Sequence, residues 1–417
     1  MLVDLIIRNY KSLRDVHLRD LPPFSVMVGA NASGKSNLVD ALDFISLVSR
    51  SGLAPAVSAK GGYENICFRR ARRSKASIEF QVTVCIPASR LRARRRAEAP
   101  LRFEYGFGFR AETRRIAAEY KVTHERLAVG RVDAVGVGLE IVREGGREPR
   151  VQLSDEAERD FGLPELDFLR DFIARAPVSE DDLLWAGRLG GILPFRQLFG
   201  FLGGCRVYQI SPEMARKAGT PERSPELGRH GENLPAAVDY LKRNEVEAFE
   251  ELVSHLNHAV STMETLDTDY VETKELGLFF KERGVGRRWY AQDVSDGTLK
   301  TVSMFLPLLD PRVTIVAIEE PENNLHPWIL RHFMEACKAQ GGGKQIFVTT
   351  HSPVAVDEVP IESLFIVRRR AGRTEIQRLD ALFPEAAQVV REELFGLGEY
   401  WDSGAISGVP EADVDVE

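Results

Sequence analysis

The segment Gly29-Ala-Asn-Ala-Ser-Gly-Lys-Ser36 constrains the fold of this chain most, because it matches G-x-x-x-x-G-K-[ST] at every fixed position. A strand-like run, FSVMV (24–28), leads into it, and the apolar-periodic run NLVDALDFISLV (37–48) leads out of it. Glycines let such a loop curl until its N–H groups point inward at a phosphate, and the helix N-terminus adds its dipole. The segment therefore predicts an α/β P-loop fold that binds ATP with Mg²⁺. The ATP-binding candidates within it are Gly29, Asn31, Ser33, Gly34, Lys35, Ser36 and Asn37.

A P-loop needs a second acidic element on a neighbouring strand, and VTIVAIEE (313–320) supplies one. Lys35 is expected to reach the β and γ phosphates, while the Ser36 hydroxyl ligates Mg²⁺. We expect Glu319 to complete the magnesium shell and Glu320 to polarise the attacking water as general base. Taken alone, the same segment also fits a buried strand that ends in solvated carboxylates.

Three further motifs stand in order around this strand: SDGT (295–298), PENNLHP (321–327) and TTHSP (349–353). Together with the P-loop they resemble the ABC-type ATPases of the RecF, SMC and OLD (overcoming-lysogenization-defect) group, whose bacterial members are often labelled AAA proteins. LIIRNYKSLRDVHL (5–18) and LGRHGENLPAAVDYL (227–241) also resemble that family, so the similarity spans roughly residues 1–400. It implies an ABC-type head, a mixed sheet around a central helix, without a nuclease domain.

The resemblance implies a role for each matching residue. His351 resembles the switch histidine that senses the γ-phosphate, and Lys11 a basic residue that approaches the nucleotide. The resemblance also implies a head-to-tail homodimer, or a higher homo-oligomer, in which each chain completes the other's site. Its signature turn, which contacts ATP held by the second protomer, is Ser295, Asp296 and Gly297, and its D-loop is Glu322, Asn323 and Asn324.

The sequence departs from the family pattern at two places. Glu319 stands where the magnesium-side carboxylate is usually Asp, although this subgroup resembles the chain in using Glu. No glutamine can be assigned to the Q-loop. Gln81 is a candidate, and a plain surface residue in the middle of a strand is the alternative.

The apolar patterning divides the chain into four parts. Residues 1–150 are predicted to form a strand-rich lobe with the P-loop, 151–285 a mostly helical insertion, and 286–400 a second lobe. The acidic tail 401–417 is expected to fray. Within the insertion, CRVYQI (205–210) is typical of a buried strand. A helix over 244–260 should bury one face, made of Val246, Phe249, Leu252, Val253, Leu256 and Val260.

Composition bounds the environment. The formal net charge is −7, and four scattered cysteines without a C-x-x-C pair favour a reduced, cytoplasmic compartment. No apolar run is long enough for a membrane span, so no membrane partner is expected. His255 and His258 are expected to be surface residues rather than metal ligands, and His326 to cap or pack beside Pro327.

Two arginine-rich runs, 69–75 and 90–96, each carry five cations in seven residues. They predict a DNA-phosphate-binding edge, with solvated loops as the alternative. The candidate DNA contacts are Arg69, Arg70, Arg72, Arg73, Arg92, Arg94 and Arg95.

The sequence thus predicts an ATPase (ATP + H₂O to ADP + phosphate) that acts as a molecular switch in DNA repair or anti-phage defence. A transporter subunit is disfavoured, because Ser295 lies 260 residues after Lys35, and a GTPase is disfavoured because no N-K-x-D motif occurs. The 66 residues after His351 hold no D-x-D cluster, so any nuclease or toxin effector is expected on a separate chain. The alternative function is a nucleotide-dependent scaffold or protein-binding regulator without DNA contact.

Overall fold

The computed structural model describes residues 1–68, 76–87, 100–112, 120–132, 138–154, 171, 183, 189, 195–271, 274–340, 343–384 and 396–402. Its contacts divide the chain into two compact units. Unit 1 comprises Met1–Pro22, Ala32–Gly204 and Val367–Gln377, and unit 2 comprises Pro23–Asn31, Cys205–Ile366 and Arg378–Glu417. Both arginine-rich runs, and with them all seven candidate DNA contacts, lie outside the described residues, as does most of the acidic tail.

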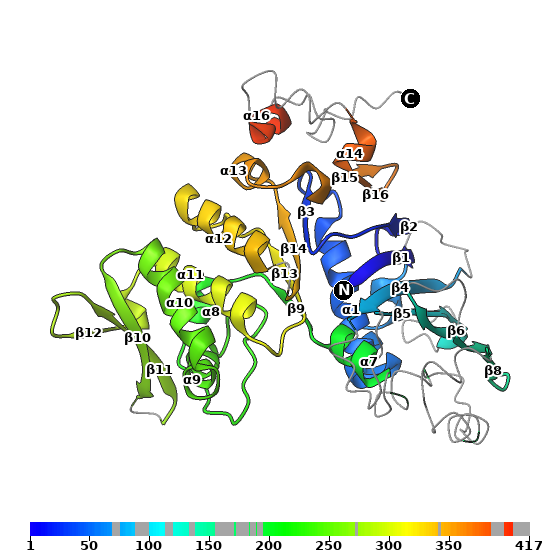
Figure 1. The fold of residues 1–417 in the computed structure, drawn as a ribbon, viewed down its shortest axis with the longest axis horizontal. Coiled ribbons are helices and arrows are strands. Elements are labelled where there is room, and N and C mark those ends of the chain that lie inside the picture. The colour runs from blue at the N-terminus through cyan, green and yellow to red at the C-terminus, as the bar shows by residue number, and fades with distance from the viewer. Residues whose placement is uncertain are drawn as a thin grey trace. The chain divides into compact units, whose positions relative to one another are not determined.

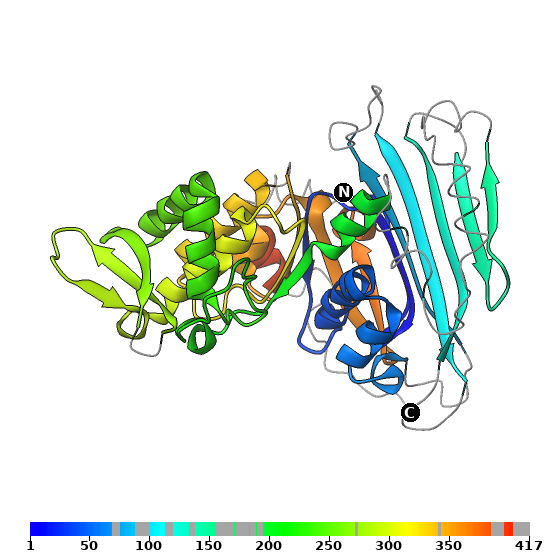
Figure 2. The same ribbon diagram turned by 90° about the horizontal axis from the view of Figure 1, so that it is seen from below.

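Unit 1 is built on a seven-stranded antiparallel sheet with the order β2-β1-β4-β5-β6-β7-β8 (Figures 1 and 2). Its strands are β1 (Leu2–Tyr10), β2 (Leu13–Leu18), β4 (Ile78–Ile86), β5 (Leu101–Ala111), β6 (Tyr120–Arg131), β7 (Leu139–Glu144) and β8 (Arg150–Leu153). Its helices are α1 (Lys35–Ser51), α2 (Leu53–Ala59), α3 (Tyr63–Ile66) and α7 (Phe195–Gly203).

Helix α1 packs on this sheet through aromatic rings. The ring of Phe44 on α1 lies 5.5 Å from that of Tyr10 on β1 and 5.3 Å from that of Phe80 on β4, centroid to centroid. Such aromatic pairs add stability beyond the apolar area that they bury. The sheet therefore fixes the helix that begins at the P-loop.

Unit 2 is built on parallel strands in the order β15-β3-β14-β13-β9. These strands are β3 (Phe24–Val28), β9 (Cys205–Tyr208), β13 (Ile315–Glu319), β14 (Gln345–Thr350) and β15 (Leu364–Arg370). β15 runs on into unit 1, where β16 (Arg373–Arg378) pairs with it. A three-stranded sheet follows α10 and consists of β10 (Met263–Tyr270), β11 (Leu276–Glu282) and β12 (Arg288–Tyr290).

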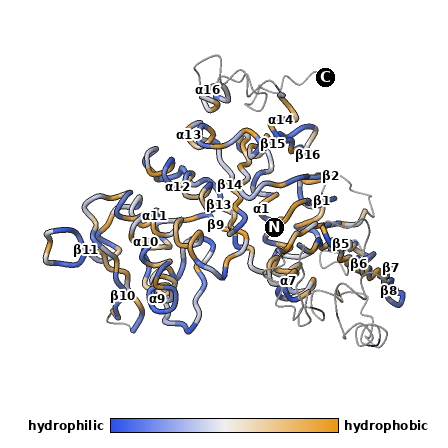
Figure 3. Tube along the Cα trace, in the orientation of Figure 1, coloured by the Kyte–Doolittle hydropathy of each residue, from blue (hydrophilic) through white to orange (hydrophobic). Residues whose placement is uncertain are grey.

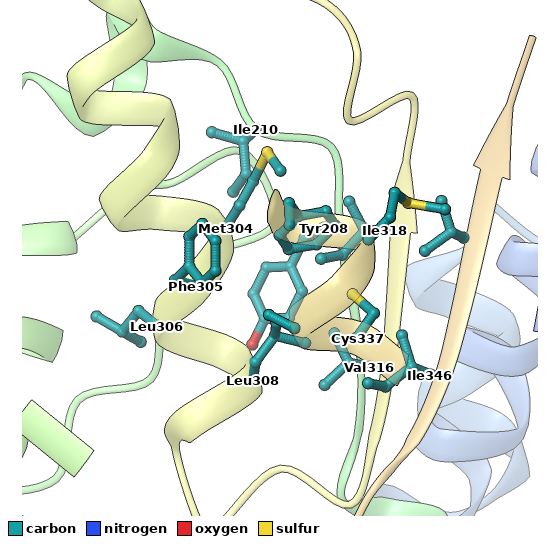
Figure 4. Close-up of a cluster of buried hydrophobic side chains, with 14 of the residues drawn as sticks. Tyr208, Ile210, Met304, Phe305, Leu306, Leu308, Val316, Ile318, Cys337 and Ile346 are labelled. Atoms are coloured by element: carbon teal, nitrogen blue, oxygen red, sulfur yellow. The ribbon is translucent and has the colours of Figure 1, made fainter. Parts of the chain in front are cut away.

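The helices of unit 2 cover these strands with apolar faces. They are α8 (Pro212–Ala215), α9 (Leu234–Asn244), α10 (Val246–Ala259), α11 (Asp296–Leu309), α12 (Pro327–Gln340), α13 (Pro353–Asp357), α14 (Leu379–Leu382) and α16 (Leu397–Asp402). Short 3₁₀ turns span Ala291–Asp293 and Ile361–Ser363. Hydrophobic and hydrophilic stretches alternate along α9, α10 and α12 (Figure 3). In the core, Met304 and Phe305 of α11 and Cys337 of α12 meet strand residues such as Tyr208 and Ile318 (Figure 4).

The structure confirms most elements expected from the patterning. The strand before the P-loop, the helix after it, CRVYQI as a strand and the strand ending at Glu319 are all present. The expected apolar face of α10 is wrong at its first residue, because Val246 is 54% exposed while Leu252 and Leu256 are buried. A residue at the first helical position has no preceding turn to pack with, so the neighbours that cover Leu252 do not reach it. The described part of 151–285 contains strands β9 to β11 beside helices α7 to α10.

Gln81 lies in the middle of β4, where it faces Ile6 of β1 on one side and Gly106 of β5 on the other. Among the described residues, none of the helices combines the length and the apolarity that crossing a bilayer requires.

Candidate functional site

The P-loop joins β3 to α1 with the backbone that its glycine positions require. Gly34 has φ +110°, and a Cβ there would lie 2.0 Å from Oγ1 of Thr374, so only glycine fits. Ala32 also has a positive φ, of 61°. The N-cap of α1 is Gly34, which has no side chain to cap the helix, and a helix N-terminus of this kind suits an anion.

Side chains from two distant segments brace the loop within unit 1. The Thr374 hydroxyl of β16 donates to the carbonyl of Ser33 at 2.8 Å, and it also pairs with the Ser12 hydroxyl at 2.6 Å. Asn37 Nδ2 donates to the same Ser12 oxygen at 2.6 Å. Arg369 Nη1 donates to the carbonyl of Ala32 at 3.2 Å. The loop is therefore held in shape by residues that no P-loop motif contains.

Lys11 lies next to α1. Its ammonium pairs with the carboxylate of Asp40, which also binds Lys60 Nζ at 2.6 Å and the Tyr10 hydroxyl at 2.7 Å. Burial alone would raise the pKa of Asp40, but the two lysines and Tyr10 outweigh it and lower that pKa. Asp40 is therefore a stable counter-ion that fixes Lys11.

A cavity of about 330 Å³ opens beside this network. Its lining combines cations, polar groups and an aromatic ring, a composition that suits the nucleoside and phosphates of a nucleotide. The lining residues are Lys11, Ser12, Asn37, Asn65, Cys67, Phe68, Arg369 and Gly372.

In unit 2, the two carboxylates of the acidic strand take different positions. Glu319 is the last residue of β13 and its side chain is 3% exposed. Glu320 has a left-handed backbone, with φ +47°, and its N–H donates to the carbonyl of Thr349 at 2.9 Å. A positive φ at a non-glycine residue stores strain, which is typical of functional turns. The Glu320 side chain thereby leaves the strand direction and accepts a bond from Asn323 Nδ2 at 2.9 Å.

The D-loop candidate Glu322 connects this turn to His351 at the end of the neighbouring strand β14. One carboxylate oxygen of Glu322 accepts from the Thr350 hydroxyl and from the His351 N–H, both at 2.9 Å. The same oxygen lies 3.1 Å from Nδ1 of His351. A carboxylate at Nδ1 fixes the ring orientation of a histidine and leaves Nε2 for another partner. Glu320 and His351 are thus brought to one edge of the parallel sheet.

The signature candidates form the start of α11. Ser295 is the N-cap, and its hydroxyl accepts from the N–H of Thr298 at 3.2 Å. Arg216 secures the turn, since its guanidinium pairs with Asp296 and donates to the carbonyl of Val294 at 2.9 Å. A Cβ at Gly297 would lie 3.6 Å from the carbonyl oxygen of Asn324, so the signature turn and the D-loop are neighbours.

Sequence reasoning missed Lys300, which lies 2% exposed on α11. Its ammonium donates to the carbonyl of Glu320 at 3.3 Å and to that of Asn323. Burial lowers the pKa of Lys300 to about 8, against the attraction of Glu322 and Glu320. No motif identifies this residue, because only the packing of α11 against the turn reveals its acceptors.

The donor groups fit ATP and Mg²⁺. The Ser36 hydroxyl in unit 1 and the Glu319 carboxylate in unit 2 are each an oxygen donor of the kind that Mg²⁺ prefers. The Ser33 hydroxyl is buried and has no hydrogen-bond partner among the residues that the structure describes, as expected of a loop built to meet a ligand.

A P-loop before a helix, a strand ending in two carboxylates, and a histidine on the neighbouring strand define the class: this is a P-loop ATPase head of the ABC type, similar to those of RecF and SMC proteins. The chain belongs to the family described as "AAA domain, putative AbiEii toxin, Type IV TA system", which matches residues 24–184 and 211–357. No curated protein matches the sequence significantly.

One solved SMC head shares the fold, and two others were also found. An SMC head bound to the C-terminal winged-helix domain of ScpA is 13% identical with a TM-score of 0.52, over 92% of this chain and 99% of that one. An SMC head with an extended coiled coil, bound to the C-terminal domain of ScpA derived from Pyrococcus furiosus, is 14% identical with a TM-score of 0.47, over 94% and 99% of the two chains. The SMC head from Thermotoga maritima is 12% identical with a TM-score of 0.41, over 90% and 98%. Only the first likeness bears on the fold assignment.

Proposed function

We propose that this protein binds and hydrolyses ATP as a molecular switch whose dimerisation depends on ATP. The observation that carries the proposal is the turn after β13, which links Glu320 to His351 through Asn323 and Glu322. A base and a γ-phosphate sensor that share one hydrogen-bonded turn are suited to phosphoryl transfer to water.

Each residue has a defined role in the proposed reaction. Lys35 and the N–H groups of the P-loop bind the phosphates, and Lys11 approaches the nucleotide. Bound Mg²⁺, held by Ser36 and Glu319, would neutralise charge on the phosphates. Glu320 orients and polarises the attacking water, and His351, whose ring Glu322 orients at Nδ1, contacts the γ-phosphate through Nε2.

The exposure of the signature and D-loop residues supports the proposal of a second protomer. Ser295 and Asp296 are exposed, and so are Asn323 and Asn324 of the D-loop. An exposed helix N-terminus is an anion site, and here it lies beside the D-loop, whose amides can cross an interface. A second copy that presents its ATP to this surface would complete both sites of a head-to-tail homodimer, each formed by the P-loop of one copy and the signature turn of the other.

The biological setting is proposed as anti-phage defence or DNA repair. The family description names a toxin of a toxin–antitoxin system, which favours defence. The structurally similar SMC head is bound to a domain of another protein, ScpA, which supports a separately encoded partner here, such as a nuclease or toxin effector. DNA contact through the arginine-rich runs remains a prediction of the sequence.

Glu320→Gln tests the proposal. The variant should bind ATP normally and lose at least two orders of magnitude in turnover, because general-base assistance is worth about that much. It should also accumulate as an ATP-bound dimer. Phosphate release and light scattering after size-exclusion chromatography measure the two effects.

Glu335→Gln on the exposed face of α12 is the matched control, since it makes the same chemical change away from the turn. Unchanged hydrolysis in Glu320→Gln would remove Glu320 from the mechanism. A Glu320→Gln variant that stays monomeric at saturating ATP would contradict the ATP-dependent dimer.

A further inference from the structure

Glu319, the proposed magnesium ligand, is already bound to a cation of the chain itself. Nη2 of Arg229 donates to Oε1 of Glu319 at 2.7 Å. The Glu319 side chain is 3% exposed and that of Arg229 is 36% exposed. The guanidinium of Arg229 therefore covers the Glu319 carboxylate on its solvent side.

Backbone hydrogen bonds tie the loop that carries Arg229 to the segment that follows β9. β9 runs parallel to β13, so the residues after both strands lie at the same edge. After β9, the N–H of Gln209 donates to the carbonyl of Arg229 at 2.8 Å. Gly231, with φ +91°, turns the loop back toward α9. These backbone bonds place Arg229 beside Glu319 although 90 residues separate them.

The chemistry of the pair points to competition with a metal. A buried carboxylate is costly unless a cation compensates it, and a guanidinium is always charged in a protein. Mg²⁺ needs a carboxylate oxygen at close range, and Arg229 already holds one of the two oxygens. Nε of Arg229 is buried without a hydrogen-bond partner among the described residues, so the guanidinium is only partly satisfied in this position.

We propose that Arg229 is a positioning residue: it holds Glu319 before the metal arrives and competes with the divalent cation for that carboxylate. The inference rests on the proposed function, because it takes Glu319 as the magnesium ligand. It gives the LGRHGEN segment a role, namely to keep the acidic edge stable without nucleotide and to raise the Mg²⁺ concentration that the site requires.

The test compares the full-length wild type with Arg229→Ala, Glu319→Gln and the double variant. Mn²⁺ binding in the presence of adenylyl imidodiphosphate is followed by electron paramagnetic resonance, and urea unfolding is measured in EDTA without nucleotide. Arg206→Ala is the matched control, because Arg206 forms an ion pair with Glu226 in the same unit, at 2.5 Å, without touching Glu319. Arg229→Gln replaces the alanine variant if that variant does not fold.

Arg229→Ala should lower the half-saturating Mn²⁺ concentration about five-fold, equivalent to about 1 kcal/mol, while Arg206→Ala leaves it unchanged. In EDTA, Arg229→Ala should unfold at a lower urea concentration than wild type. Adding Glu319→Gln in the double variant should restore the urea midpoint, because a neutral amide needs no counter-ion.

An unchanged Mn²⁺ midpoint in Arg229→Ala, with normal binding by the wild type, would overturn the inference alone. A wild type that binds no Mn²⁺ with the nucleotide would overturn the proposed function and the inference with it.

Discussion

Lys300→Met should reduce ATP turnover far more than it reduces stability. The two carbonyls that Lys300 binds belong to the turn of Glu320, and charge-assisted bonds of this kind contribute about 1.5–3 kcal/mol each. Against them stands the cost of charging a buried amine. The pKa of Lys300 falls from 10.5 to about 8, which corresponds to roughly 3 kcal/mol at neutral pH. The difference leaves a net loss of about 0–3 kcal/mol in the free energy of unfolding.

The kinetic effect should be larger, because the turn that orients Glu320 is strained. Glu320 has φ +47°, and the bonds from Lys300 help to hold its carbonyl in that conformation. Once they are lost, the turn can relax by an ångström, a displacement that costs about 100-fold when it affects a catalytic group. Phosphate release at saturating ATP gives the turnover, and urea unfolding gives the stability.

Lys344→Met is the matched control. The Lys344 ammonium donates to the carbonyls of Pro307, at 3.1 Å, and of Asp310, and burial lowers its pKa to about 8 as well. This lysine contacts nothing in the Glu320 turn, so its loss should affect stability without a comparable loss of turnover. Equal losses of turnover in the two variants, or full turnover in Lys300→Met, would refute the reasoning.

Three more outcomes are expected. Ser295→Arg and Lys35→Ala should each be inactive, and mixing them should recover part of the ATPase activity, since one composite site of the heterodimer is intact. Proven heterodimers without ATPase activity would contradict the head-to-tail dimer. His255 and His332 share a hydrogen bond of 2.9 Å, and burial lowers the pKa of both, that of His332 to about 4. The unfolded chain therefore binds more protons below pH 6.5, and stability should fall by about 1 kcal/mol between pH 6.5 and 4, after allowance for the exposure of His332. A urea midpoint that falls as much between pH 6.5 and 4 in His332→Gln as in the wild type would contradict this. Neutralising the first arginine-rich run should lower the log–log salt slope of DNA binding by roughly 0.9 per lost phosphate contact, as measured by fluorescence anisotropy; a wild type without salt-dependent DNA affinity would exclude the DNA reading. The residues to neutralise are Arg69, Arg70, Arg72 and Arg73.

Local rules explain why so many elements could be predicted from the sequence. Ser295 followed by an apolar-periodic run predicts a helix N-cap, and the structure has that cap. The runs that end at Glu319 and Thr350 are too short and too apolar for surface helices, and both are buried parallel strands. The fold class follows from this alternation of strands and helices.

Contacts between distant segments could not be predicted in the same way. Thr374 meets the P-loop from 341 residues away, and nothing near Thr374 in the sequence indicates it. His255 was expected at the surface, but its side chain is half-buried, because α12 places His332 against it. Strand order has the same character: that β9 lies beside β13 depends on sheet pairing, which no local pattern encodes.

The acidic turn after β13 also receives contacts from distant segments of the chain. Lys300 binds its carbonyls from α11, the helix whose N-cap is the signature residue Ser295. Glu322 joins its other side to His351. A helix moves as a unit, so a phosphate bound at the start of α11 cannot shift that helix without also moving the two carbonyls that Lys300 holds. In the proposed reaction, phosphate binding at Ser295 and the position of Glu320 in the same chain would therefore be linked through Lys300, little more than one helical turn from Ser295 on α11.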